Sequence, residues 1–255
     1  MIDPSNYRFG LPVAASTYAS RVDSALNILH VGMVAIFVLW GVFFTYCLIR
    51  YRRNAQPVAS HGSSKGGMIS FAPDIMVLAF EIWLIFSLGM PIWSHIKEEF
   101  PPASESNHVN LIAEQFAWGF QYPGADNTFG KRDPLQISSA NTIGIDANDP
   151  ASKDDIITLN ELHVPIGKPT LLQMTSKDVI HSFFVPEFRV KHDVVPGMNL
   201  PLWFQPLKAG RYEIGCAQLC GLGHYKMRGE VVAESDADFE AWKIAQLKEK
   251  EEASQ

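Results

Sequence analysis

Soft metal ligands are concentrated near the C-terminal end of the chain. Cys216 and Cys220 stand four residues apart, His224 follows four residues later, and Met227 comes three residues after that. Thiolate, imidazole and thioether groups select copper or zinc over hard cations such as Mg²⁺ and Ca²⁺. Strand-like runs precede and follow this segment, so it is expected to form one loop at the end of a β-domain. The residue types and their spacing predict a metal site.

Three other kinds of site use part of this ligand set. Two cysteines four residues apart in an exported domain often form a disulfide. Structural zinc sites use cysteine and histidine but rarely methionine. A site for a single electron-transfer copper uses two histidines, one cysteine and an axial methionine, which leaves a cysteine unused. His224 and Met227 taken singly are also compatible with ordinary packing, but all four side chains together favour copper.

A second imidazole ligand must come from elsewhere in the chain. His181 lies in the segment Lys177–Pro186, at a strand end flanked by apolar residues. A lone histidine in such a place is more often a structural residue than a ligand. Because the loop supplies only one histidine, His181 is the candidate for the second.

A long apolar stretch lies ahead of the polar part of the chain. Ser24–Ile49 contains 26 residues without Asp, Glu, Lys or Arg, and about 20 such residues suffice to cross the hydrocarbon core of a membrane. A cleaved signal peptide is the alternative. It is disfavoured because the stretch starts late, is too long, and is followed by basic residues rather than a small-residue cleavage site. Residues 24–50 are predicted to span a membrane.

A second apolar stretch, residues 71–96, contains Asp74 and Glu81. Its longest uncharged run is only 15 residues, which taken alone also fits a buried core helix. The first predicted span favours a second one, because a membrane hairpin is more plausible than one spanning helix beside a lone soluble helix. The prediction is a transmembrane hairpin over residues 24–97, preceded by a short polar segment, residues 1–23.

The loop between the predicted spans is basic. Arg50, Arg52, Arg53 and Lys65 lie in it, and it has no acidic residue. The positive-inside rule therefore places this loop in the cytoplasm. Both termini and the remainder of the chain are expected on the other side of the membrane, in the periplasm or the intermembrane space.

The remainder of the chain is acidic and predicted to be all-β. Residues 97–255 carry 15 Lys and Arg against 23 Asp and Glu, which suits a basic partner and argues against nucleic acid. Runs rich in β-branched and aromatic residues occur at 109–120, 156–164, 169–174, 200–205, 210–214 and 230–233. They predict a sandwich or small barrel. Residues 108–235 would form this domain, with 124–155 as a long excursion between strands. Residues 236–255 read as a short C-terminal helix and tail.

Three segments together resemble the CuA-binding, cupredoxin-like domain of cytochrome c oxidase subunit II. They are Asp178–Phe183, Lys191–Gly197 and Cys216–Met227, in the order typical of that family. The aromatic run Gln115–Tyr122 and the predicted hairpin extend the resemblance to roughly residues 20–233.

The resemblance implies a dinuclear copper centre, CuA. In the family, two cysteines bridge the copper ions, one histidine binds each copper, and a methionine and a backbone carbonyl are weak ligands. The corresponding residues here are Cys216, Cys220, His181, His224, Met227 and the carbonyl of Gln218, with Asp193 as a supporting residue.

The resemblance also implies a role and partners. A family member accepts electrons from cytochrome c and passes them to haem in subunit I, where O₂ is reduced and protons are pumped. The chain would then be one subunit of an oxidoreductase, with subunit I, other oxidase subunits, cytochrome c and membrane lipid as partners. No Cys-x-x-Cys-His motif is present, so the donor is expected to be a separate protein. The implied location is a bacterial inner membrane, with the CuA domain in the periplasm.

Three positions depart from the family pattern. Gln218 replaces a glutamate whose carboxylate helps to hold Mg²⁺ at the boundary with subunit I, and an amide oxygen is a poorer ligand for that cation. Phe116 replaces the tryptophan that takes electrons from cytochrome c, so either Phe116 or Trp118 is expected to do this. Asp74 corresponds to a glutamate at the mouth of a proton channel in subunit I.

Two other functions fit the same residues. A membrane nitric oxide reductase with a CuA subunit differs only in its partner subunit. A membrane-tethered copper-binding or copper-delivery protein belongs to another class and would bind one copper reversibly. Such a protein has no use for a two-helix anchor or an ordered aromatic run.

Overall fold

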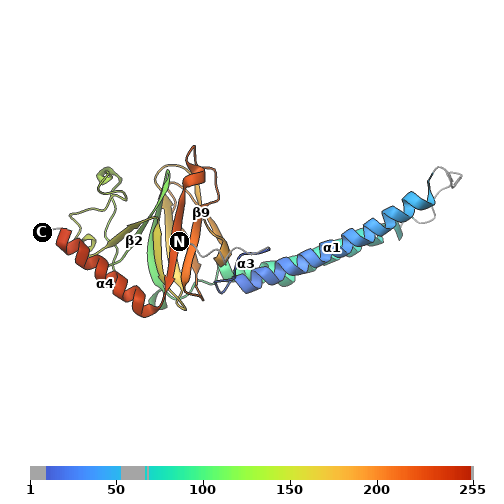
Figure 1. Ribbon diagram of the computed structural model, residues 1–255, viewed down its shortest axis with the longest axis horizontal. Helices are drawn as coiled ribbons and strands as arrows, with labels where there is room; N and C mark the ends of the chain where they lie inside the picture. The colour runs from blue at the N-terminus through green and yellow to red at the C-terminus, as the bar shows by residue number, and fades with distance from the viewer. Residues whose placement is uncertain (1–9, 53–66, 68, 254–255) are drawn as a thin grey trace. The chain divides into compact units, whose positions relative to one another are not determined.

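The computed structural model describes residues 10–52, 67 and 69–253, and it divides into two units. Residues 21–98 form a helical unit, and the residues before and after them form a β unit that ends in a helix (Figure 1). The division agrees with the predicted hairpin followed by a β-domain.

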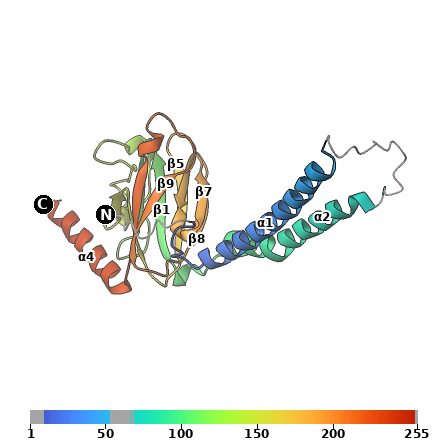
Figure 2. The same cartoon turned by 45° about the vertical axis from the view of Figure 1, so that its right-hand side comes forward.

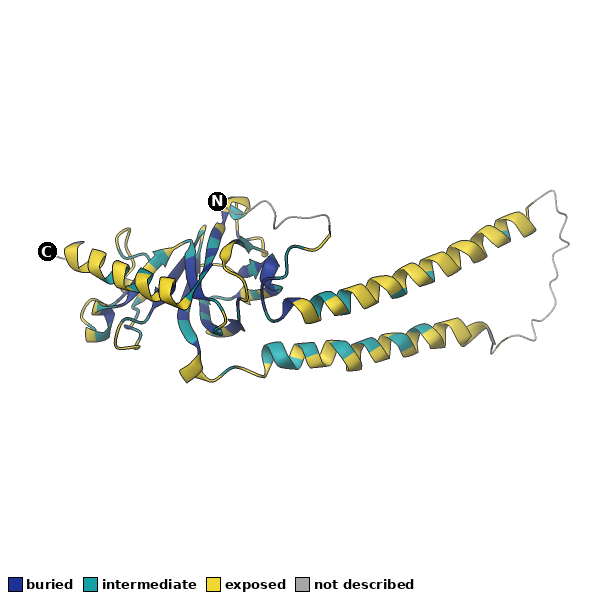
Figure 3. Ribbon diagram, turned by 60° about the horizontal axis from the view of Figure 1, so that its bottom comes forward, coloured by how far each residue is buried: buried dark blue, intermediate teal, exposed yellow. Residues whose placement is uncertain are grey.

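The helical unit contains two long apolar helices. The first is α1 (Ala19–Arg50), and the second consists of α2 (Ala72–Leu84), the π-helical segment η4 (Ile85–Gly89) and α3 (Met90–Lys97). By length and composition, both are able to cross a membrane. Most of their side chains are exposed, as Figure 3 shows. The predicted hairpin is therefore confirmed as two apolar helices, and most of its basic loop, including Arg53 and Lys65, lies outside the described residues.

The π-helical segment precedes a proline. Pro91 has no N–H group, and in an α-helix its ring clashes with the carbonyl four residues earlier. In η4 the N–H of Met90 instead donates to the carbonyl of Ile85, five residues back. The wider turn lets the second helix continue through Pro91 to Lys97.

The β unit is a sandwich of two five-stranded sheets, as predicted. One sheet has the order β3-β2-β1-β5-β8 and the other β4-β10-β9-β6-β7 (Figure 2). The strands are β1 (Asn107–Glu114), β2 (Ala117–Tyr122), β3 (Ile156–Leu159), β4 (Glu161–Pro165), β5 (Thr170–Ser176), β6 (His181–Val185), β7 (Val190–Val194), β8 (Leu200–Phe204), β9 (Gly210–Cys216) and β10 (Arg228–Glu234).

Large apolar side chains fill the β unit. Burying apolar side chains of this size contributes about 1.5–3 kcal/mol each. The fully buried ones include Leu111, Trp118, Phe120, Leu172, Met174, Phe183, Phe188, Phe204 and Ile214. This burial holds the two sheets together.

Two predicted runs are each a pair of strands. Residues 109–120 were expected to be one run, but the chain reverses at Gln115 and Phe116, and β1 pairs with β2 in antiparallel fashion. Residues 156–164 break at Asn160, whose φ of 60° is left-handed, a conformation that asparagine tolerates better than most residues. Because β3 pairs with β2 and β4 with β10, the chain changes sheets at Asn160.

The hairpin of β6 and β7 was not among the predicted runs. Its strands pair from His181 opposite Val194 to Val185 opposite Val190. The short 3₁₀ turn η8 (Pro186–Phe188) and Arg189, with φ of 57°, close it. His181 had been placed at a strand end, and it is the first residue of β6.

The excursion and the C-terminal helix are confirmed. Residues 124–155 connect β2 to β3 through short turns without a long strand or helix. The final helix, α4 (Asp236–Ala253), packs through Trp242, which stacks on His163 with ring centroids 4.0 Å apart.

Residues 15–18 are part of the β unit, although the sequence suggested only a polar lead. The N–H of Ala15 donates to the carbonyl of Glu187 at 3.0 Å, and the N–H of Leu207 donates to the carbonyl of Ala15 at 2.8 Å. Tyr18 is buried and its hydroxyl donates to the carbonyl of Trp203 at 2.8 Å. These contacts make residues 15–18 part of the β unit.

Glu187, under this N-terminal segment, is expected to destabilise the fold at neutral pH. Its side chain is fully buried, and neither carboxylate oxygen has a hydrogen-bond partner among the described residues. Burial raises its pKa above the usual value, so the folded state favours the proton, and stability is lost as the pH rises through the folded-state pKa. Glu187→Met should raise the free energy of unfolding near pH 7 by about 1–3 kcal/mol.

The measurement is unfolding of the full chain in detergent at pH 5 and pH 7.5, followed by circular dichroism. The substitution should also flatten the loss of stability between these pH values. Glu105→Met, at an exposed position, is the matched control and should change little. A Glu187→Met chain that is less stable at pH 7.5 would contradict the expectation.

Candidate metal centre

Strand pairing brings the predicted ligands to one end of the β unit. β6 and β9 are antiparallel neighbours, with Phe183 opposite Cys216. His181 at the start of β6 and Cys216 at the end of β9 therefore lie at the same edge. The loop from Cys216 to Met227 continues from β9, contains the turn η9 (His224–Lys226) and leads into β10.

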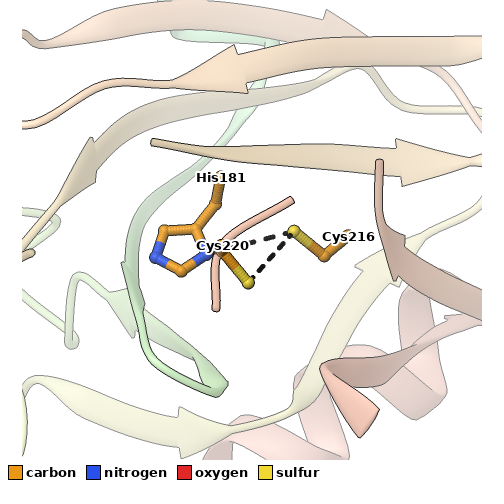
Figure 4. Close-up of side chains that lie close together, drawn as sticks. All are labelled: His181, Cys216 and Cys220. Atoms are coloured by element: carbon orange, nitrogen blue, oxygen red, sulfur yellow. Dashed lines mark hydrogen bonds between the residues drawn. The ribbon is translucent and has the colours of Figure 1, made fainter. Parts of the chain in front are cut away.

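Two thiols and one imidazole form the centre of the site. His181, Cys216 and Cys220 place their ligand atoms within 4.8 Å of one another, and Figure 4 shows the three side chains converging. The Sγ atoms of Cys216 and Cys220 are 3.9 Å apart. Nδ1 of His181 lies 4.0 Å from Sγ of Cys216.

The other predicted ligands surround this centre. Sδ of Met227 lies 3.1 Å from Nδ1 of His181 and 3.7 Å from Sγ of Cys220. Nδ1 of His224 lies 3.5 Å from Sγ of Cys220. The structure thus brings together all four side chains of the loop with His181.

The backbone carbonyl of Gln218 also points into the site. Its oxygen lies 3.1 Å from Sγ of Cys216. The side chain of Gln218 is exposed. The carbonyl, and not the amide side chain, is therefore the group that reaches the thiols.

These donors fit copper better than the alternatives. A disulfide needs sulfur atoms about 2.05 Å apart, and both cysteines are free thiols in the structure. The thioether of Met227 is buried within the ligand set, whereas structural zinc sites rarely use methionine. Two soft thiols, two imidazoles and a thioether are the donors that copper prefers.

Hydrogen bonding sets the protonation of this site. Burial raises the pKa of the Cys216 thiol, but hydrogen bonds from His181 and from the backbone of Ser182 outweigh it and lower the pKa to about 6. Burial and the neighbouring charge of Cys216 raise the pKa of Cys220 to about 11. The lowered pKa of Cys216 favours its thiolate, the form that binds metal.

Asp178 orients His181. The Nε2–H group of His181 donates to the Asp178 carboxylate at 2.9 Å, which leaves Nδ1 as the nitrogen facing the sulfur atoms. The same carboxylate accepts from the N–H of Gln115 at 2.7 Å. Burial raises the pKa of Asp178, but the hydrogen bond from His181 brings it below its usual range.

The supporting role had been assigned to Asp193, not Asp178. Asp193 is exposed on β7, and its Cα pairs with Ser182 rather than with His181. The structure therefore gives it no contact with the described ligands. A signal for Asp178 was present in the sequence, because it stands three residues before His181.

A family model matches half of the chain. Residues 108–235 match the model described as cytochrome c oxidase subunit II, periplasmic domain, and these residues contain every predicted copper ligand. The chain belongs to the cytochrome c oxidase subunit II family.

Similar proteins bear the same name over most of the chain. An alternative cytochrome c oxidase subunit 2 of Bradyrhizobium diazoefficiens is 33% identical over 225 residues, which cover 87% of this chain and 78% of that protein. A cytochrome c oxidase subunit 2 of Cereibacter sphaeroides is 27% identical over 248 residues, covering 91% and 78%. Among solved structures, the periplasmic domain of subunit II of cytochrome oxidase of Bradyrhizobium japonicum is 28% identical. That comparison covers 59% of this chain and 99% of that one, with a TM-score of 0.44. The family is thus that of an oxidoreductase subunit.

The two aromatic candidates for accepting electrons in this subunit II chain lie in different surroundings. Phe116 is 37% exposed, and its ring lies against the ligand loop, where it occupies the space that a Cβ atom on Gly223 would need. Trp118 is fully buried and meets the ring of His181 edge-on, with centroids 6.1 Å apart. Only Phe116 is placed at the surface, where a partner protein can touch it.

Asp74, the candidate for a proton channel, belongs to the helical unit, whereas the predicted copper ligands belong to the β unit. It stands in the first turn of α2, within the helical unit, and its side chain is exposed. Its role in a channel stays a prediction.

Proposed function

We propose that this chain is the electron-accepting subunit of a cytochrome c oxidase and holds a dinuclear copper centre. The observation that carries the proposal is the convergence of two free thiols, two imidazole nitrogens and a buried thioether at one end of the sandwich. When bound, a thiolate-bridged copper pair supplies reversible one-electron chemistry.

The proposed ligands would bind such a pair in three different ways. Cys216 and Cys220 would bridge the two ions, and His181 and His224 would each bind one. Met227 and the carbonyl of Gln218 would be the weak ligands. His181 is the first residue of β6, and the loop that carries the other ligands runs from the end of β9 to the start of β10. Because these strands anchor the ligand segments, the ligands need to move little when an electron arrives or leaves.

Phe116 is the proposed point at which the donor, a separate cytochrome c, makes contact. Its ring covers the ligand loop from the surface, and Trp118 lies beneath, against His181. The acidic β unit supports a basic donor protein, because opposite charges accelerate encounter.

The assembly proposed for the chain is a bacterial inner membrane oxidase. α1 and the α2–α3 helix would span the membrane, with both termini and the metal site in the periplasm, and subunit I would receive the electrons for O₂ reduction. A Mg²⁺ ion at the boundary with subunit I would be held weakly, because Gln218 offers an amide where a carboxylate binds Mg²⁺ better.

Copper content and electron paramagnetic resonance of the purified complex test the function. We expect two copper ions per chain and one unpaired electron shared equally between them. One copper ion that a chelator removes readily would point instead to a copper-delivery protein. Zinc, or a disulfide between Cys216 and Cys220 as the native state, would contradict the proposal. Turnover with nitric oxide but not with O₂ would assign the chain to a nitric oxide reductase.

A further inference from the structure

A cavity of about 340 Å³ lies between the excursion, residues 124–155, and the adjoining strands of the β unit. Ligand sites in proteins commonly measure about 300–1,000 Å³, so the size of this cavity suits a small molecule. None of the proposed copper ligands lines it. It is called the Arg132 cavity, and its lining includes Ile112, Arg132, Ile137, Ile143, Thr175 and Lys177.

The walls of the Arg132 cavity are held by strand-like pairing and close packing. Arg132 and Ile145 form an antiparallel bridge, which joins two segments of the excursion. Ile143 and Ile145 pack with Ile112 of β1 in a buried cluster. The contact is tight, because a Cβ atom on Gly119 of β2 would lie 2.7 Å from the side chain of Ile143. The excursion is therefore fixed to itself and to the sheet, and the cavity is a formed site.

The guanidinium group of Arg132 has no partner within the described part of the chain. The side chain is half-buried, burial lowers its pKa, and no acidic neighbour offsets this effect. Arg211 behaves differently, since a hydrogen bond to Glu230 at 2.6 Å raises its pKa. Withdrawing a charge from water costs free energy unless an opposite charge or a hydrogen-bond acceptor compensates. Arg132 therefore favours an anion in the cavity.

The other polar groups of the lining set the charge of this anion. Nζ of Lys177 donates to the carboxylate of Glu114 and, at 2.5 Å, to the carbonyl of Thr142. The charge of Lys177 is thus balanced by Glu114, and one of its three N–H donors is left over. Thr175 adds a hydroxyl group to the lining. Arg132 remains as the one uncompensated charge among the described lining residues, which matches a single negative charge.

The rest of the lining indicates the shape of the ligand. Ile112 and Ile143 are buried, and Ile137 lies beside them in the wall. Branched apolar side chains such as these favour a hydrocarbon body. The planar guanidinium fork pairs with a carboxylate through two parallel hydrogen bonds. A small molecule with one carboxylate and an apolar body satisfies both halves of the cavity.

We propose that the Arg132 cavity binds a small organic monocarboxylate. The carboxylate pairs with the guanidinium group of Arg132, and the hydrocarbon body packs against Ile112, Ile137 and Ile143. Lys177 and Thr175 supply the remaining hydrogen-bond donors. The site is independent of the proposed copper centre, because the two share no residue.

Equilibrium dialysis of radiolabelled hexanoate against the full chain in a non-ionic detergent tests the proposal. We expect one saturable site per chain, with detergent alone as the blank. Hexanol has the same hydrocarbon body without the charge and should compete at least about tenfold more weakly. Inorganic phosphate, which has no hydrocarbon body, should also compete more weakly than unlabelled hexanoate. Hexanol that binds as tightly as hexanoate, or phosphate that binds more tightly, would overturn the proposal.

Three variants test the role of Arg132. Arg132→Gln should weaken hexanoate binding at least about tenfold, because a hydrogen-bonded ion pair is lost. Arg132→Lys keeps the charge without the planar fork and should recover part of the affinity. Lys131→Gln removes the same charge from the exposed neighbouring position and should stay within about twofold of wild type. Equal losses in Arg132→Gln and Lys131→Gln would overturn the proposal. The comparison of hexanoate with hexanol uses the unmodified chain, so it does not depend on whether a variant folds.

The same dialysis on the purified complex tests the choice of a small molecule as the ligand. Hexanoate should bind the assembled complex with an affinity within about twofold of that for the separate chain, and Arg132→Gln should weaken it there as well. Loss of hexanoate binding on assembly would mean that another subunit fills the cavity, and it would overturn the assignment to a small carboxylate.

Discussion

A Cys216→Ser chain is expected to lose the proposed copper pair and, with it, the proposed electron transfer from cytochrome c. Serine has nearly the same shape, but its hydroxyl is protonated at neutral pH and is a poor ligand for copper. Cys216 is also the thiol with the lowered pKa, about 6, and it lies next to both Cys220 and the carbonyl of Gln218. Loss of a residue that only supports a ligand costs about 10–100-fold in metal affinity. We expect copper affinity and electron input to fall by more than about 100-fold here.

The measurement is copper per chain together with the rate of reduction by a basic cytochrome c. Cys47→Ser is a matched control, because Cys47 is a free cysteine in α1, and this variant should keep both properties. A Cys216→Ser chain that still bound two copper ions and accepted electrons at the wild-type rate would exclude Cys216 as a bridging ligand.

The candidate metal loop could be predicted because its chemistry is local. Four candidate ligand side chains occur within twelve residues of sequence, and no tertiary contact is needed to see that their donors are soft. His181 was found because the set was incomplete, although it lies on another strand. The apolar helices were equally visible, since uninterrupted hydrophobicity is a property of the sequence itself.

Strand boundaries were less predictable where a turn lacked the usual residues. The reversal between β1 and β2 occurs at Gln115 and Phe116, without Gly, Pro, Asn or Asp to mark it. Apolar residues resume at Phe116, directly after Glu114 and Gln115, so one long run was expected. Because the turn was not recognised, the sequence also did not show that Phe116 is exposed and Trp118 is buried. The burial of these two side chains depends on how this turn folds.

The choice between Asp178 and Asp193 depended on strand register. β7 pairs with β6 so that Val194 is opposite His181 and Asp193 is opposite Ser182. Successive residues of a strand point to opposite faces, so Asp193 projects away from the side on which His181 reaches the thiols. No sequence pattern gives that register. Asp178 precedes β6 in a turn, from which its carboxylate reaches back to Nε2 of His181.

Asp178→Ala is therefore expected to weaken copper binding by about 10–100-fold. The substitution removes the acceptor for the Nε2–H group of His181, so the imidazole loses the contact that directs Nδ1 toward Cys216 and Met227. It also frees the N–H of Gln115, next to Phe116. Copper titration in competition with a chelator of known affinity measures the effect. Asp178→Asn keeps an acceptor oxygen and should recover part of the affinity.

Asp193→Ala is the control that decides between the two carboxylates. Asp193 is exposed and makes no side-chain contact with a ligand among the described residues, so its removal should leave the copper affinity within about twofold of wild type. Equal losses in the two alanine variants would mean that general charge, and not the hydrogen bond to His181, sets the affinity. A larger loss in Asp193→Ala would show that the ligands are supported from β7. A loss of copper affinity in Asp178→Ala alone would mean that the turn before β6 is part of the metal site. Contacts at both ring nitrogens would then position His181 before copper binds.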